Sequence, residues 1–393
     1  MRFYSSQNHC IAPPRAGRLL GIGMVLLMFV AAGRTEQRRG FTIWNVRVEP
    51  HFDFSATYDD NVFLDVANRK SDLYTLVKPG VRFSLGNEKR NLLTLDYTAE
   101  FQRFNNQTQA DSENQYLDFK AKFSGRRFTL IAGHKLQEMT SGNPETSSRI
   151  TSFINTSTLS ADMKVSRKTS LGTSYKQDLY TYDSAAQISY RVHEIRAFAN
   201  HRILSRSMVS GEIASGWIVS DGGLNDTTYQ QFNLGVTLSP RARWSATAKL
   251  GFEHREVELN NNAVNSFIGS VNIARVINES TTVKLEARRS VNPSITQGGT
   301  TVTNDSVEVN LDRKIGRRLT ANVVARYRRD SYDQTFAGVE RTDNSFEGEV
   351  KLSYQFRKWG KMGISYKHLE NHSSLPTVNY KQNVGTFQIS VYY

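Results

Sequence analysis

Charged side chains at every second position are the residues of this sequence that could do chemistry. Glu286 and Arg288 stand two residues apart, as do Glu349 and Lys351. On a β-strand this spacing puts both members of a pair on the same face. A row of such charges attracts, repels or selects ions. The pattern therefore predicts electrostatic selection of ions, provided that the strands line a water-filled space.

Local enzyme motifs do not occur in the sequence. The eight histidines are scattered without a metal-ligand spacing such as HExxH, and there is no GxSxG elbow or phosphate-binding glycine loop. We expect no enzymatic activity, no catalytic residue, no cofactor and no metal site. An active site assembled from residues on separate strands stays open as an alternative.

The composition excludes several classes of protein. With one Cys in 393 residues, 38% hydrophobic residues and a mean hydropathy of -0.49, the chain is neither a disulfide scaffold nor a helical membrane bundle. An aromatic content of 11% argues against disorder. The net charge of +13 is spread along the chain without a binding motif, so we expect no nucleic-acid partner.

Apolar and polar residues alternate along most of the chain. Between residues 46 and 58, apolar side chains such as Phe52 and Phe54 alternate with polar ones such as Asp53 and Ser55. Similar segments recur up to the C-terminus, and each is predicted to be a strand with one apolar face. The phase is ambiguous at residues 190–203 and 208–219.

Short and long connections alternate between these strands. Short basic turns at 86–91, 124–127, 167–170, 240–243, 277–280, 316–318 and 357–361 are separated by longer polar loops. The expected loops are 59–72, 105–114, 140–151, 257–265, 292–303, 333–343 and 370–379. The junctions give about 18 strands, or 16 if the ambiguous region 183–226 holds fewer. An even number leaves both ends of the barrel on the short-turn rim.

These features predict an all-β fold: a transmembrane antiparallel up-and-down β-barrel with short periplasmic turns and longer extracellular loops. A strand protein can cross hydrocarbon only as a closed sheet, because lipid offers no hydrogen-bond partner. Aromatic residues at the ends of apolar faces fit interfacial girdles. They are Tyr58, Phe101, Trp244, Tyr327, Phe356 and Tyr366. A water-soluble sandwich or propeller is the alternative.

The N-terminal region has the pattern of a secretory signal. An apolar run at 19–33 follows a basic stretch and ends in Ala31, Ala32 and Gly33. We expect a signal peptide at 1–33, a short periplasmic segment at 34–45 and the barrel at 46–393. A soluble or membrane-anchored N-terminal helix is the alternative.

The last strand ends on an aromatic residue of its apolar face. Phe387, Ile389, Val391 and Tyr393 alternate with more polar neighbours. This pattern resembles the signal that bacterial outer-membrane proteins present to the barrel-assembly machinery, which we expect as a partner. The expected location is the Gram-negative outer membrane, in contact with its lipid and lipopolysaccharide.

The hexapeptide YDDNVF at residues 58–63, followed by Pro79-Gly80-Val81 in the next strand, resembles the start of the second putative β-barrel porin family. The motif covers only about the first fifth of the mature chain. The resemblance implies a porin-like barrel of a kind often associated with exopolysaccharide export, and a periplasmic export component as partner. The aspartates of the motif could bind a divalent cation or lipopolysaccharide, or they could belong to an ordinary solvated loop.

The polar strand faces supply the candidate pore-lining residues. These are Arg82, Lys120, Lys249, Arg255, Glu286, Arg288, Arg326, Arg328, Glu349 and Lys351. Their basic excess suggests a mild preference for anions, whereas pairing between neighbouring strands would make them a structural lattice.

The expected function is a passive channel for small solutes or for export of a polysaccharide. The alternative is a structural or surface-interaction barrel with a closed lumen. The basic turns could gather anionic chains, contact anionic lipid head groups, or simply be soluble turn residues.

Overall fold

Eighteen antiparallel strands, β2 to β19, close into a single barrel. The computed structural model describes residues 40–241, 243–259, 262–336 and 339–393. The expected signal peptide at 1–33 lies outside the described residues. In the described part of the chain, no helix is long and apolar enough to cross a membrane. The predicted fold class is therefore confirmed, with 18 rather than 16 strands.

The strands span most of the chain, and three short 3-10 turns interrupt the loops at Thr108–Ala110, Asp221–Gly223 and Pro376–Val378. The strands are β1 (Phe41–Ile43), β2 (Val46–Asp59), β3 (Asp72–Gly86), β4 (Leu92–Phe104), β5 (Ser112–Ser124), β6 (Phe128–Asn143), β7 (Ser148–Lys164), β8 (Thr169–Tyr182), β9 (Tyr190–Leu204), β10 (Ser207–Ser220), β11 (Thr227–Arg241), β12 (Trp244–Val257), β13 (Asn262–Asn278), β14 (Thr281–Pro293), β15 (Thr301–Ile315), β16 (Leu319–Phe336), β17 (Val339–Arg357), β18 (Gly360–Ser373) and β19 (Tyr380–Tyr392).

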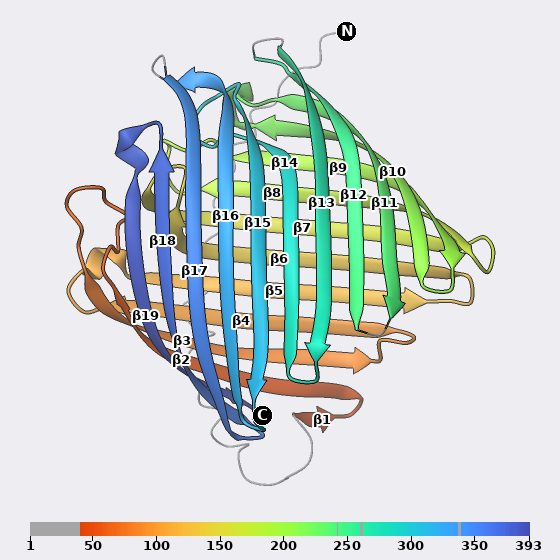
Figure 1. Ribbon diagram of the computed structural model, residues 1–393, viewed down its shortest axis with the longest axis horizontal. Helices are drawn as coiled ribbons and strands as arrows, with labels where there is room; N and C mark the ends of the chain where they lie inside the picture. Colours follow the sequence, from red (N-terminus) through yellow and green to blue (C-terminus); the bar gives the residue numbers. More distant parts are fainter. Residues whose placement is uncertain (1–39, 242, 260–261, 337–338) are drawn as a thin grey trace. The chain divides into compact units, whose positions relative to one another are not determined.

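The barrel closes where its last strand pairs with its first long one. Strand β19 runs antiparallel to β2 from Val384, opposite Asp59, to Tyr392, opposite His51. In Figure 1 the blue strands β15 to β19 cross in front of the orange and yellow strands β2 to β7 at a steep angle, as tilted strands on opposite walls do. A closed sheet leaves no long unpaired edge in hydrocarbon.

The two faces of the sheet differ in chemistry. Ile213 and Phe232 oppose each other on β10 and β11 and are 59% and 52% exposed, whereas Thr57 and Asp59 on the other face are buried. Apolar side chains exposed to this extent belong on the lipid side of a barrel. The same parity resolves the ambiguous segments, because Ile195 of β9 also lies on the apolar face.

Three of the expected long loops are wrong. Residues 140–151, 257–265 and 333–343 are largely strand, since β6 runs to Asn143, β7 starts at Ser148, and β16 and β17 extend to Phe336 and from Val339. Polar residues in these segments read as loops in the sequence. Cross-strand backbone pairing nevertheless continues through them, for example between Gly142 and Arg149.

The short strand β1 completes the seam between β2 and β19. Phe41 pairs with Val48 and Ile43 with Val46, directly beyond the point where β19 ends. The backbone N–H of Tyr393 donates to the carbonyl of Pro50 over 3.1 Å, and the rings of Phe41 and Tyr393 lie 6.5 Å apart. Part of the expected periplasmic segment therefore extends the barrel wall, and the first long strand, β2, begins at Val46.

Candidate functional site

Charged residues form rows across the inner face of the barrel. Glu286, Glu308, Arg326 and Glu347 stand opposite one another on β14 to β17. Arg326 Nη2 lies 2.5 Å from Glu308 Oε2, and its Nη1 lies 3.5 Å from Glu347 Oε2. One guanidinium thus bridges carboxylates on both neighbouring strands and fixes the row. Glu286, at the end of the row, has no ion pair with any residue that the structure describes.

Register places all ten candidate pore-lining residues on this inner face, but the structure separates them into two groups. Five of the candidates form ion pairs at 2.5–2.8 Å. The pairs are Arg82 with Asp96, Lys249 with Glu212, Arg255 with Glu253, Arg326 with Glu308, and Arg328 with Asp330. Lys351 donates to Gln388 Oε1 over 3.2 Å. Within the described residues, Lys120, Glu286, Arg288 and Glu349 have no ion pair. The expected pairing between neighbouring strands is present for Arg82 and Arg326, whereas Arg255 and Arg328 pair within their own strands and Lys249 reaches past β11 to β10.

Arg255 differs from the other candidates because it is buried. Its side chain is 4% exposed, its Nε lies 2.8 Å from Glu253 Oε1, and its Nη2 donates to the carbonyl of Val291. Its guanidinium also lies over the ring of Tyr229, 5.3 Å from the centroid. Arg255 thus connects β12 to β14. Although it lies on the inner face, its side chain is covered by neighbouring residues and does not contact open water.

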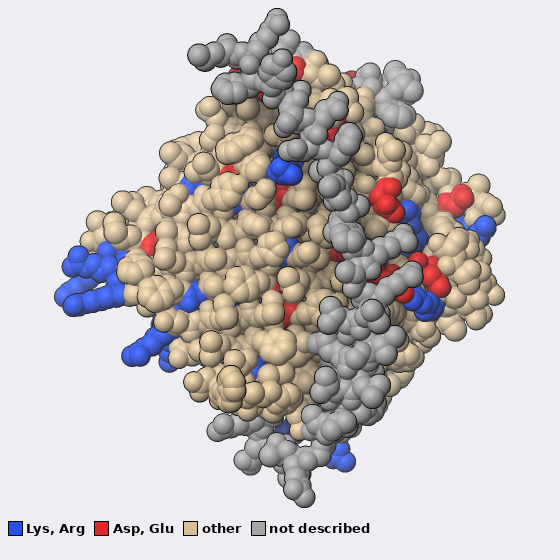
Figure 2. All heavy atoms as spheres, turned by 180° about the vertical axis from the view of Figure 1, so that it is seen from behind, with Lys and Arg blue, Asp and Glu red and all other residues tan. Residues whose placement is uncertain are grey.

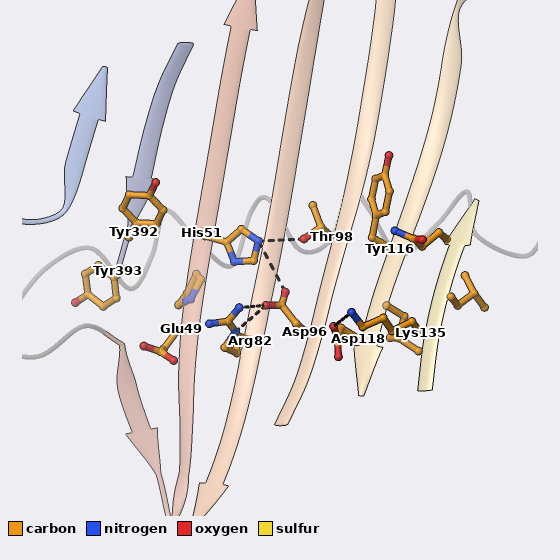
Figure 3. A pocket seen from close by; sticks show the side chains of 14 residues that line it. Glu49, His51, Arg82, Asp96, Thr98, Tyr116, Asp118, Lys135, Tyr392 and Tyr393 are labelled. Atoms are coloured by element: carbon orange, nitrogen blue, oxygen red, sulfur yellow. Dashed lines mark hydrogen bonds and ion pairs between the residues drawn. The ribbon is translucent and has the colours of Figure 1, made fainter. Parts of the chain in front are cut away.

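A recess of about 490 Å³ lies along β2 to β6 near the short-turn end of the barrel. Figure 3 shows His51 and Arg82 converging on Asp96. His51 Nε2 lies 3.0 Å from Thr98 Oγ1, and Arg82 Nη2 lies 2.6 Å from Asp96 Oδ2. Lys135 pairs with Asp118 on the neighbouring strands at 3.4 Å. Charges of both signs therefore line this recess, which suits a hydrated passage.

The tip of the β6–β7 hairpin, residues 144–147, reaches across the opposite end of the barrel. The carboxylate oxygen Oε1 of Glu145 accepts hydrogen bonds from Ser294 Oγ, from Thr296 Oγ1 and from the backbone N–H groups of Ile295 and Thr296, at 2.5–3.2 Å. The Glu145 carbonyl accepts from Arg341 of β17 over 2.7 Å. These partners belong to the far wall, so the hairpin tip lies across the long-loop mouth.

The loop at residues 294–300 connects β14 to β15 and is the other half of this arrangement. We name residues 144–147 and 294–300 the mouth cluster. Ser294 and Thr300 are 0% and 1% exposed. Asn225, from the β10–β11 loop, donates to the carbonyl of Ser294 over 2.8 Å, and Ile188 donates to the carbonyl of Ile295 over 2.8 Å. Segments from four separate hairpins therefore meet at the mouth.

The YDDNVF motif folds against the barrel seam. Asp60 accepts hydrogen bonds from the backbone and side chain of Asn383 on β19, both over 2.6 Å. Asn61 is fully buried and donates to the carbonyls of Asp65 and Lys381. Among the described residues, no group of three His, Cys, Asp or Glu side chains is arranged to hold a metal ion. The motif fastens the β2–β3 loop to the closing strand and is not an open solvated loop.

Asp65 shapes the same β2–β3 loop from its exposed side. The backbone N–H groups of Asn68 and Ala67 lower the pKa of its carboxyl. Because the pKa is lowered in the fold, this turn is stabilised above the ordinary pKa of an aspartate and loses that stabilisation as the pH falls through the lowered value.

The terminal apolar residues lie on the outer face of the closing strand. Phe387 pairs with Ala56 and is 42% exposed, and Ile389 and Val391 pair with Phe54 and Phe52. Tyr393 follows at the short-turn rim. Recognition of these residues by an assembly machinery remains a prediction.

Sequence reasoning missed the mouth cluster entirely. Glu145, Ser294 and Arg341 are separated by up to 196 residues along the chain. Polar residues in loops carry no periodic pattern that pairs one loop with another. The one available signal was the unusual polarity of the β6 and β7 ends, which indicates residues beyond the lipid-facing wall.

Comparisons with known proteins support this architecture. A family model described as "Putative beta-barrel porin 2" matches residues 224–393. A search of curated protein sequences finds no match. The chain resembles the Pseudomonas aeruginosa outer membrane protein OpdK, with a TM-score of 0.50, 14% identity, and coverage of 88% of this chain and 99% of that one. For OccK9 (OpdG) of the same organism the TM-score is 0.51 at 13% identity, covering 90% and 100%.

At such low identities the solved structures show the fold alone, and the family model matches less than half of the chain. That model describes porins rather than enzymes. Its match lies in the second half of the chain and does not include the YDDNVF motif. The match over residues 224–393 is to the porin family that the sequence resembles, and together with the outer-membrane barrel fold it supports the expected location in the bacterial outer membrane.

Proposed function

We propose that the protein is a passive pore for small hydrated solutes. The observation that carries this proposal is the closed 18-strand barrel with an apolar outer face and rows of charged side chains on its inner face. A barrel of this size encloses an aqueous interior, which loops can narrow. Charged inner rows would be costly to bury in a dry core.

The mouth cluster supports small solutes rather than a polymer. Glu145 and the loop at 294–300 join opposite walls, so any solute must pass beside their contacts. Export of a polysaccharide, the other expected function, would require this cluster to separate. A closed structural barrel would require the cluster to seal the mouth fully.

The unpaired cations support a mild preference for anions. Among the described residues, Lys120 and Arg288 on the inner face have no ion pair and are exposed, whereas most other inner cations are neutralised by neighbours. The acids Glu286 and Glu349 are also without an ion pair there, so the preference is expected to be small. OpdK has a structure with vanillate, a small carboxylate. We propose small organic anions as the solutes that this lumen passes most readily.

Liposome swelling tests this proposal. Vesicles holding the refolded protein should swell at rates that fall with solute size, and a small carboxylate such as vanillate should enter faster than a neutral solute of equal size. Equal entry of both would remove the anion preference. No swelling with any solute would favour the structural barrel, and rapid entry of a long oligosaccharide would favour polymer export.

A further inference from the structure

Pairs of adjacent cations stand on five of the short turns. They are Lys89 and Arg90 between β3 and β4, Arg126 and Arg127 between β5 and β6, Arg167 and Lys168 between β7 and β8, Arg317 and Arg318 between β15 and β16, and Arg357 at the end of β17 with Lys358 in the turn that follows it. All ten side chains are exposed. None forms an ion pair with a described residue, in contrast to the paired cations of the lumen. Figure 2 shows Lys and Arg side chains gathered at its left edge, where the turns after β5 and β7 lie.

Exposed aromatic side chains stand beside these turns on the outer face. Phe123 and Phe128, 47% and 44% exposed, bracket the β5–β6 turn, and their ring centroids are 5.7 Å apart. Phe356 and Trp359 bracket the β17–β18 turn in an edge-to-face contact at 5.6 Å, with Trp359 51% exposed. Outward aromatic rings of this kind sit at the level of lipid head groups, so the neighbouring cations lie at that level too.

We name the ten cations of these five turns the basic rim. We propose that the basic rim binds the anionic phospholipid head groups of the periplasmic leaflet and anchors the barrel there. Short turns face the periplasm in barrels of this class. Each cation near an anionic lipid surface is attracted to it, and the attraction falls within a Debye length. This inference goes beyond the proposed pore, because it concerns the outer edge of the barrel rather than its lumen.

A polyanion and an acidic periplasmic protein would also be attracted by the positive charge, but neither accounts for all the features of the basic rim. A polyanion entering the lumen would be attracted by the cations but would not need outward aromatic rings beside them. An acidic periplasmic protein would be expected to contact one part of the rim, whereas the cation pairs recur on turns of both β3–β8 and β15–β18. The combination of recurring cations and lipid-facing rings favours the membrane leaflet.

The test compares the folded full-length protein in phosphatidylcholine nanodiscs with and without phosphatidylglycerol. We expect phosphatidylglycerol to raise the thermal midpoint by several degrees, and high salt to cancel the rise. The rim variant carries Arg126→Gln, Arg127→Gln, Arg357→Gln and Lys358→Gln and should lose about half of the rise. The matched control carries Arg69→Gln, Lys70→Gln, Arg191→Gln and Arg329→Gln on exposed positions nearer the long-loop rim and should keep it.

Three results would overturn the anchor. The first is a midpoint that does not respond to phosphatidylglycerol in the unmodified protein, a measurement that needs no variant to fold. The second is an equal loss of the rise in rim variant and control. The third is a rise produced by soluble polygalacturonate on phosphatidylcholine discs but not by phosphatidylglycerol, which would identify the rim as a polyanion-binding surface.

Discussion

Glu145 is the single residue on which the mouth cluster depends most. One carboxylate oxygen accepts four hydrogen bonds from residues of the facing loop. Hydrogen bonds to a charged group contribute about 1.5–3 kcal/mol each, although four bonds to one atom will not add fully. Loss of the charge should therefore weaken the attachment of the hairpin tip, while the contacts of the Glu145 carbonyl with Arg341 and of Ser147 with Val378 remain.

For Glu145→Gln we expect a larger single-channel conductance and a lower thermal midpoint, because the weakened hydrogen bonds stabilise only the folded state. Glu258→Gln is the matched control, since Glu258 is an exposed acid on the same rim outside the mouth cluster. Equal conductance of the two variants would show that the cluster does not limit passage.

Arg255 and Arg288 separate structural from electrostatic roles among the candidate residues. Arg255→Gln leaves Glu253 buried without its partner and should cost about 3–5 kcal/mol of unfolding free energy. Arg288→Gln removes an exposed charge that has no ion pair among the described residues, and should change stability by less than about 0.5 kcal/mol. Urea unfolding in detergent measures both values.

The same two variants should also differ in ion selectivity. Arg288→Gln should shift the reversal potential toward cations under a salt gradient, because it removes a free positive charge from the inner face. If folded Arg255→Gln changes the ion selectivity and Arg288→Gln does not, the buried Arg255–Glu253 pair determines the selectivity instead.

At the scale of elements, adjacent strands are locked by side chains that pack over glycines. A Cβ on Gly216 of β10 would lie 2.3 Å from Tyr229 Cζ on β11. Tyr229 in turn donates to Glu194 Oε2 over 3.1 Å and packs under Arg255. The contact joins β9, β10, β11 and β12 through one aromatic ring.

Gly216→Ala should displace this ring and destabilise the barrel by about 1–3 kcal/mol. Gly211→Ala on the same strand is the control, because its nearest neighbour, Leu234 Cδ2, would lie at an ordinary 3.9 Å. Similar unfolding midpoints for the two variants would mean that Tyr229 moves aside without cost.

Strands were predictable from the sequence because burial in lipid imposes a strict period of two. That period placed Arg326 and Glu349 on the inner face, and the junctions gave about 18 strands with 16 left open, of which the structure shows 18. It could not show that Arg255 is buried, since parity gives direction but not the covering contacts of Tyr229 and Val291. Ends of hairpins were misjudged where polar strands such as β16 and β17 rise beyond the apolar wall.

At the scale of the whole molecule, the mouth contacts were beyond prediction for a different reason. Glu145 and Ser294 meet because strand tilt and barrel closure bring hairpins on opposite walls together. No local sequence pattern shows that Glu145 and Ser294 lie next to each other in the folded barrel. The YDDNVF motif shows the same limit: its aspartates suggested a loop or a cation site, while closure of β19 on β2 gave Asp60 its partner Asn383.

Single-channel conductance of the refolded protein in a planar bilayer tests the central claim most directly. A water-filled lumen narrowed at the mouth cluster predicts stable, reproducible conductance steps that increase in Glu145→Gln. Folding is checked by resistance of the unheated barrel to detergent unfolding. Barrels that pass this check but conduct no current, both as unmodified protein and as Glu145→Gln, would contradict the pore.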